Sequence, residues 1–228
     1  MQLKSFGCSF IFGSELADTS PDNPWPCFSK LTWPAHLANY LNYEYHSYAR
    51  PGAGNLQIAE RVLNQLARNE NSLYVIGWTW VDRFDYSKAT DWQEDRWATL
   101  MPTDESDGAK TYYKYLHSEY RDKVATLMSI RVVIDTLKQK GYPFLMTYMD
   151  NIMFDQKYHT TPAVVDLQEY IKPHMTKFKN QTFLEWSRSA GYPETKSWHP
   201  LEAAHQAAAD YIIKVFDKQN IIDRKHPF

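Results

Sequence analysis

Cysteine is scarce in this sequence, which has only Cys8 and Cys27 among 228 residues. Two cysteines are too few for a disulfide framework, and their spacing is not that of a metal site. We therefore expect both to be free thiols in a reducing compartment. No carboxylate motif or helical histidine pair supports a metal either, so the sequence predicts no metal and no cofactor.

Long apolar runs and an excess of one charge are also missing. No stretch approaches the ~20 apolar residues needed to cross a bilayer. The first predicted strand begins almost at Met1, which leaves no room for a signal peptide. Lys and Arg total 25 against 27 Asp and Glu, a net charge of −2, so neither nucleic acid nor a membrane is an expected partner. We expect a cytoplasmic protein.

Short apolar runs alternate with amphipathic segments along the chain, as is typical of βαβ units around a parallel sheet. The length fits a single α/β domain spanning residues 1–228. After a first strand that ends near Gly7, we expect further strands at 43–49, 73–78 and 143–149. The spacing of apolar residues predicts helices over 33–41, from Asn55 onward, over 119–140 and 164–171, and from Pro200 onward.

The segment 81–118 does not fit this alternation. It combines many charged residues with the aromatic residues Trp92, Trp97, Tyr112, Tyr113 and Tyr115. A long irregular stretch inside a compact domain is often functional, although a plain surface excursion is the alternative. We expect an insertion that forms a lid or a substrate-binding wall, with aromatic rings suited to stacking on sugars unless they simply pack.

Ser9 stands at the carboxyl end of the first predicted strand, between Gly7 and Gly13. Open α/β sheets bind ligands outside the carboxyl ends of their strands. The glycines allow a turn that presents Ser9 to a substrate as a nucleophile, whereas an ordinary tight turn is the alternative.

Two later segments are expected at the same edge of the sheet. Pro51-Gly52-Ala53-Gly54-Asn55 follows the second strand, so its backbone N–H groups and the Asn55 side chain are candidates to face a developing oxyanion. A glycine turn with an asparagine cap is the alternative. Gly77-Trp78-Thr79-Trp80 follows the third strand, where Thr79 offers a hydroxyl donor.

Trp198-His199-Pro200 places a histidine just before the last predicted helix, at its N-cap position. Its ring is not committed to the apolar stripe of that helix, so His199 is the best candidate for a general base. His205 lies within the helix, where packing or hydrogen bonding is the expected role. Their spacing is not that of a helical metal site.

In this order the four segments resemble the sequence blocks of the SGNH hydrolases, also called the GDSL esterase/lipase family. Gly7-Cys8-Ser9 with Gly13 is similar to the first block, Gly-Asp-Ser-x-x-x-Gly, with Cys8 in place of the aspartate. The resemblance extends over nearly the whole chain. It implies a flavodoxin-like three-layer α/β/α sandwich with a mainly parallel sheet, Ser9 as nucleophile, and the N–H groups of Ser9 and Gly52 in the oxyanion hole.

Two positions depart from the family pattern. Thr79 replaces the asparagine that donates to the oxyanion in the third block, Gly-x-Asn-Asp, and Lys196 replaces the aspartate of the last block, Asp-x-x-His. A lysine cannot orient the histidine as a carboxylate does. A serine–histidine dyad, another acid or an impaired site are the alternatives. Glu194 is a candidate for that acid, and Asp82 and Asp150 are others.

The resemblance implies a serine esterase that acts on a small acyl ester, such as an O-acetylated glycan, through an acyl-enzyme on Ser9 with His199 as base. An O-acyltransferase would use the same residues. A non-catalytic protein that binds a glycan or a partner in the same crevice is the alternative from another class. Nucleotide binding at residues 52–54 lacks the full glycine fingerprint.

Overall fold

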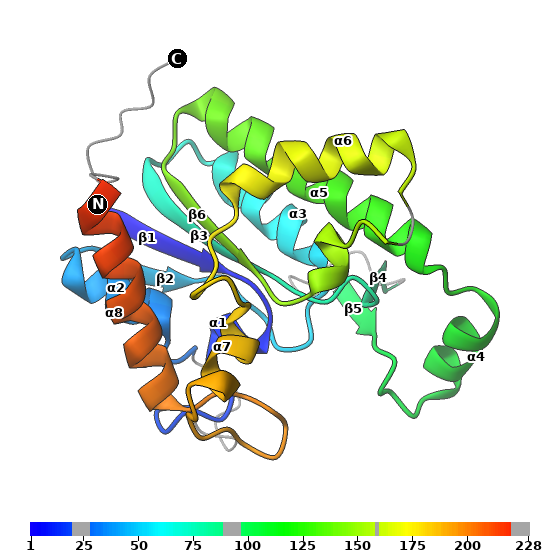
Figure 1. The fold of residues 1–228 in the computed structure, drawn as a ribbon, viewed down its shortest axis with the longest axis horizontal. Coiled ribbons are helices and arrows are strands. Elements are labelled where there is room, and N and C mark those ends of the chain that lie inside the picture. Colours follow the sequence, from blue (N-terminus) through cyan, green and yellow to red (C-terminus); the bar gives the residue numbers. More distant parts are fainter. Residues whose placement is uncertain (20–27, 89–96, 158–159, 220–228) are drawn as a thin grey trace.

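A four-stranded parallel sheet in the order β2-β1-β3-β6 forms the centre of the molecule (Figure 1). The computed structural model describes residues 1–19, 28–88, 97–157 and 160–219. The strands are β1 (Gln2–Phe6), β2 (Glu44–Ser47), β3 (Ser72–Trp78) and β6 (Phe144–Tyr148). All seven residues of β3 are buried, as expected for a central parallel strand that is covered on both faces.

Helices cover both faces of this sheet, which gives the predicted three-layer α/β/α sandwich. Alternate residues of β3 point to opposite faces, so Leu73 and Val75 join one apolar core while Tyr74 and Ile76 join the other. The first core includes residues of α2 (Trp33–Tyr40) and α8 (Glu202–Gln219). The second includes residues of α3 (Asn55–Leu66), α5 (Glu119–Lys140) and α6 (Pro162–Ile171).

Helix α5 has the bounds predicted from the sequence, because both of its ends carry strong local signals. The Ser118 side chain accepts a hydrogen bond from the N–H of Arg121, and Gly141 ends the helix with φ +67°. The last helix differs from the prediction, since it begins at Glu202 and not at Pro200. Asn55 also differs, because it is the first residue of α3 and Gly54 is the N-cap.

Several short helices complete the chain. These are α1 (Ser9–Phe12), η1 (Asn151–Phe154), η2 (Lys172–His174) and α7 (Phe183–Ser189). In the part of the chain that the structure describes, no helix combines the length and the apolar character required to cross a bilayer.

The segment 81–118 forms a small unit beside the beginning of α5 (Figure 1). Strands β4 (Phe84–Ser87) and β5 (Trp97–Leu100) pair in antiparallel fashion, and α4 (Asp107–Tyr115) follows them. Trp92 lies outside the described residues. This unit leaves the central sheet parallel throughout.

Candidate active site

Ser9 is the first residue of α1, directly beyond the carboxyl end of β1. The helix sits close to the strands because two glycines make room for Ile11. A Cβ atom on either Gly7 or Gly77 would lie 2.6 Å from Cγ1 of Ile11. The backbone N–H of Ser9 belongs to the first turn of the helix, where such groups have no partner within the helix.

His199 lies against Ser9, with 2.8 Å between its Nε2 atom and the Ser9 Oγ atom. A tight turn holds the histidine, in which the N–H of His199 donates to Thr195 Oγ1 at 3.2 Å and the N–H of Thr195 donates to the His199 carbonyl at 2.9 Å. The ring of Phe10 packs edge-on against the imidazole at 5.1 Å between centroids. The structure thus brings together the two catalytic candidates, although His199 lies ahead of α8 and is not its N-cap.

Glu15 is the carboxylate that meets this histidine, because it pairs with His199 Nδ1. Thr195 Oγ1 donates to Glu15 Oε2 at 2.8 Å and Ser197 Oγ donates to Oε1 at 3.3 Å. The hydrogen bond from His199 is the main reason that the pKa of Glu15 lies below its ordinary value. Gly13 ends α1 with φ +81° and Glu15 itself has φ +67°, so this turn directs the carboxylate back toward the histidine.

The three acids suggested by the sequence have other positions. Glu194 is held by Arg188, whose Nε and Nη2 atoms donate to its two oxygens at 2.9 and 3.3 Å. Asp150 accepts the N–H groups of Val81 at 2.9 Å and Ile152 at 3.0 Å, which is a structural role. Asp82 lines the cavity in front of Ser9, and burial raises its pKa. The expectation of Glu194 beside His199 is therefore replaced by Glu15.

The predicted oxyanion donors divide into two groups. Ser9 and Gly52 both line the cavity, and Gly52 has φ +77°. Asn55 and Thr79 are buried instead. Asn55 Oδ1 accepts the N–H of Thr79 at 2.8 Å, and its Nδ2 donates to the Thr79 carbonyl at 3.1 Å and to Thr126 Oγ1 at 3.3 Å. The Asn55 side chain thus holds the backbone at Thr79, and neither Asn55 nor Thr79 lines the cavity.

A cavity of about 750 Å³ opens in front of Ser9 and His199. Segments from both halves of the chain build its walls. Its remaining lining residues are Phe10, Ser14, Pro51, Gly52, Trp80, Asp82, Arg83, Met101, Pro102, Thr103, Leu184, Arg188, Lys196, Ser197 and Trp198. Five of them come from the segment 81–118, which therefore forms one wall of the cavity.

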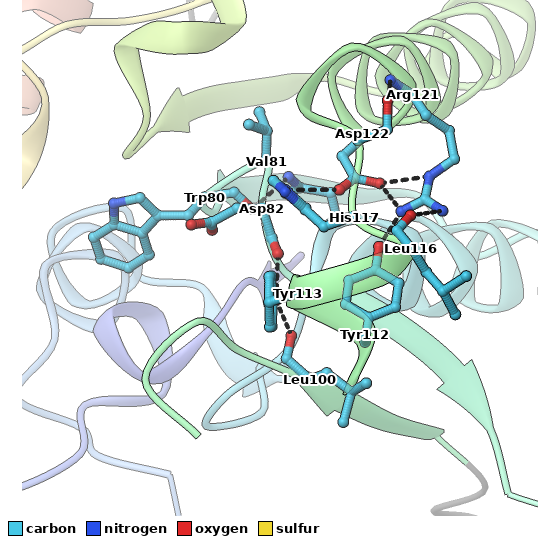
Figure 2. Close-up of polar contacts among 12 residues, drawn as sticks. Trp80, Val81, Asp82, Leu100, Tyr112, Tyr113, Leu116, His117, Arg121 and Asp122 are labelled. Carbon is cyan, nitrogen blue, oxygen red and sulfur yellow. Dashed lines mark hydrogen bonds and ion pairs between the residues drawn. The ribbon is translucent and has the colours of Figure 1, made fainter. Parts of the chain in front are cut away.

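Two of the tyrosines expected to line this wall, Tyr113 and Tyr112, hold it in place instead. The Tyr113 hydroxyl donates to the backbone carbonyls of Asp82 at 2.6 Å and Leu100 at 2.8 Å, as Figure 2 shows. Tyr112 contacts Arg121 of α5, which ties the unit to the main body. None of the aromatic residues predicted for this wall and described by the structure lines the cavity; these are Trp97, Tyr112, Tyr113 and Tyr115. Trp80 and Trp198, outside the segment, do.

His205 has the structural role predicted for it. Its Nδ1 atom accepts the N–H of Trp33 at 3.2 Å, and its ring also hydrogen-bonds to the backbone of Pro200, next to His199. Complete burial lowers the pKa of His205 to about 3. The described residues contain no group of three His, Cys, Asp or Glu side chains arranged to hold a metal ion.

Comparisons with known proteins agree with this fold. No protein-family model and no curated protein sequence matches the chain. Among solved structures, an esterase (EstA) from Pseudoalteromonas sp., inhibited by monoethylphosphonate, is 10% identical, with 96% of this chain and 98% of that chain covered and a TM-score of 0.55.

Two carbohydrate esterases are also similar. An acetyl xylan esterase (Est2A) from Butyrivibrio proteoclasticus is 12% identical, with 96% of this chain and 64% of that one covered and a TM-score of 0.53. A family 2 carbohydrate esterase from Corynascus thermopiles is 15% identical, with 95% and 65% covered and a TM-score of 0.52. The chain has the fold of the SGNH hydrolases, as the sequence blocks predict.

Proposed function

We propose that this protein is a serine esterase that hydrolyses a small acyl ester through an acyl-enzyme on Ser9. The observation that carries the proposal is the 2.8 Å distance between Ser9 Oγ and His199 Nε2, together with the pairing of His199 Nδ1 with Glu15. A nucleophile within hydrogen-bond reach of a base, which a carboxylate orients, is the arrangement that activates a serine.

In the first half of the reaction, His199 Nε2 accepts the Ser9 hydroxyl proton while Ser9 Oγ bonds to the ester carbonyl carbon. The carbonyl electron pair moves to its oxygen, and the N–H groups of Ser9 and Gly52 stabilise the resulting oxyanion. When the oxyanion collapses, the bond to the alcohol oxygen breaks and His199 gives its proton to that oxygen. Glu15 remains ionised and stabilises the imidazolium.

Water completes the reaction. It gives a proton to His199 and attacks the acyl carbon, and the second oxyanion collapses with release of the carboxylic acid and return of the proton to Ser9. An alcohol that replaces water at this step would make the protein an O-acyltransferase, so the acceptor decides between the two activities.

An O-acetylated glycan is a substrate that the cavity favours. Trp80 and Trp198 line it together with Ser9, and Trp198 is 60% exposed. Indole rings pack well on the apolar faces of sugar rings, because they offer a large apolar face together with a polar N–H group. Two of the similar structures carry carbohydrate esterase names, which supports the same substrate class.

Hydrolysis of a short-chain aryl ester tests the proposal. The wild type is compared with Ser9→Ala and His199→Ala, and with Ser129→Ala on the exposed face of α5 as a matched control. We expect kcat to fall by roughly 10³-fold or more in the first two variants, and to be unchanged in the control. A folded wild type without turnover contradicts the proposal and favours a non-catalytic binding protein.

A further inference from the structure

The cavity in front of Ser9 gathers positive charge. Three of its lining side chains are cationic, Arg83, Arg188 and Lys196, and Asp82 is the one carboxylate among its lining residues. The whole chain carries a net charge of −2, so this local excess does not follow from a basic composition. The partners of each of these three side chains decide whether its charge is available to a ligand.

Arg188 is already neutralised. Its guanidinium makes two hydrogen bonds with the Glu194 carboxylate, at 2.9 and 3.3 Å, and lies over the Trp198 ring at 5.9 Å from the ring centroid. Such a paired arginine supports the tryptophan and offers little free charge to a substrate.

Arg83 is fixed in place without a carboxylate partner among the described residues. Its Nη1 atom donates to the Ala53 carbonyl at 3.1 Å, and its guanidinium carbon lies 4.8 Å from the Trp80 ring centroid. Asp82 and Asp85, close to it in the chain, offset part of its charge without an ion pair. The remaining N–H groups keep the planar geometry that suits the two oxygens of a carboxylate or phosphate.

Lys196 is exposed and has no ion pair with any residue in the described ranges. It occupies the position where the SGNH pattern has an aspartate, three residues before His199. Since Glu15 contacts His199 from another segment, a carboxylate is not required at position 196. A lysine there adds an exposed positive charge to the lining of the cavity.

We infer that Arg83 and Lys196 bind an anionic group of the ester, a carboxylate or a phosphate, that lies away from the scissile bond. The ester part of this inference rests on the proposed function. The immobilised guanidinium fixes the position of the anion, and the lysine adds charge that attracts it to the cavity. The substrate class is then an acyl ester of an acidic compound, such as an acidic sugar.

Binding to the Ser9→Ala protein tests the inference without any turnover. The ligands are an aryl acetate with a ring carboxylate, its neutral methyl ester, and an aryl acetate with a ring phosphate, each titrated by calorimetry. We expect one of the two anionic ligands to bind about tenfold more tightly than the neutral one, the gain of one favourable charge-assisted contact. The two anionic ligands distinguish carboxylate from phosphate recognition.

Substitutions then assign the effect to the two residues. Lys196→Met and Arg83→Lys should each lose part of the preference for the anionic ligand, and Arg83→Met with Lys196→Met should abolish it. Lys140→Met is the matched control, because Lys140 ends α5 at the opposite edge of the sheet. Arg83→Lys keeps the charge but not the planar fork, so it remains informative if Arg83→Met fails to fold.

The outcomes separate this inference from the proposed function. Preferential binding of an anionic ligand that the wild type does not hydrolyse would sustain the inference and contradict the esterase. Hydrolysis of the neutral ester with equal binding of all three ligands would support the esterase and contradict the inference. A preference that survives in the double variant would also overturn the role of Arg83 and Lys196.

Discussion

The carboxylate of Glu15 meets Nδ1 of His199 across 184 residues of sequence. Two turns make this contact, one that follows α1 and one that holds Thr195 and His199 together. The carboxylate beside His199 therefore comes from the turn just after Gly13 and not from the block that contains the histidine. This explains how Lys196 can stand three residues before His199 without disrupting the site.

Substitution of Glu15 by Gln should strongly reduce the proposed esterase activity. The amide keeps the size of the side chain but removes the charge that stabilises the imidazolium and fixes its tautomer. We expect kcat for an aryl ester to fall by roughly 10³- to 10⁴-fold. Glu194→Gln is the matched control and should change kcat by less than about threefold, because loss of an exposed ion pair has a small effect. A larger effect of Glu194→Gln than of Glu15→Gln would contradict the assignment.

Thr79→Val should leave catalysis intact. The Thr79 hydroxyl is fully buried and has no hydrogen-bond partner in the described structure, so valine removes an unsatisfied polar group at little cost. We expect kcat within about twofold of the wild type and an unchanged or higher midpoint in chemical denaturation. A fall of about 10²-fold in kcat would instead show that the hydroxyl serves the oxyanion.

Asp85→Ala should destabilise the protein through α3. The Asp85 carboxylate accepts the N–H groups of Gly54 at 3.0 Å and Gln57 at 2.9 Å, and the Thr99 hydroxyl at 2.6 Å. Its loss leaves two backbone donors at the helix start unsatisfied, which should cost about 2–3 kcal/mol in the free energy of unfolding. Urea denaturation measures this value. Asp107→Ala, at the exposed start of α4, is a control that should cost less than about 1 kcal/mol.

His205 should make the stability depend on pH. Its pKa is about 3 in the folded protein against an ordinary 6.5, so below pH 6.5 the unfolded chain binds a proton that the folded chain does not. The contribution of neutral His205 to the free energy of unfolding is complete above pH 6.5. It declines as the pH falls toward 3, by up to about 1.4 kcal/mol per pH unit.

Denaturation at pH 7 and pH 5.5 checks this dependence. Compared with the wild type, His205→Asn should lose less stability between the two values, since asparagine does not titrate. Equal losses in the two proteins would mean that His205 is not the group responsible.

Local patterns were sufficient to predict the framework of the molecule. The apolar spacing and Gly141 predicted the bounds of α5, and the structure adds the Ser118 cap at its start, so each end depends on nearby residues. Ser9 and His199 could be proposed because strand ends in a parallel sheet share one edge. The segment 81–118 was predicted as an insertion that forms a lid or a substrate-binding wall, but its strands were not predicted, since they pair with each other and not with the main sheet.

Glu15 and Asn55 could not be assigned in the same way. The contact between Glu15 and His199 depends on the left-handed backbone of the turn. A glutamate rarely adopts this conformation, so its presence in the sequence does not predict such a turn. One signal was present, because Glu15 is the first carboxylate of the chain and follows Ser9 by six residues. In the sequence Asn55 resembles a helix cap. Only the tertiary structure reveals that its side chain forms hydrogen bonds with Thr79 and Thr126.

Reaction of the folded protein with a fluorophosphonate tests the central claim most directly, with the site identified by intact mass and peptide mapping. A serine activated by His199 and Glu15 should form one covalent adduct on Ser9. The adduct should persist in Cys8→Ala, which excludes reaction of the neighbouring thiol, and should be absent from Ser9→Ala. A folded wild type that forms no adduct, or an adduct that remains in Ser9→Ala, would contradict the proposed active site.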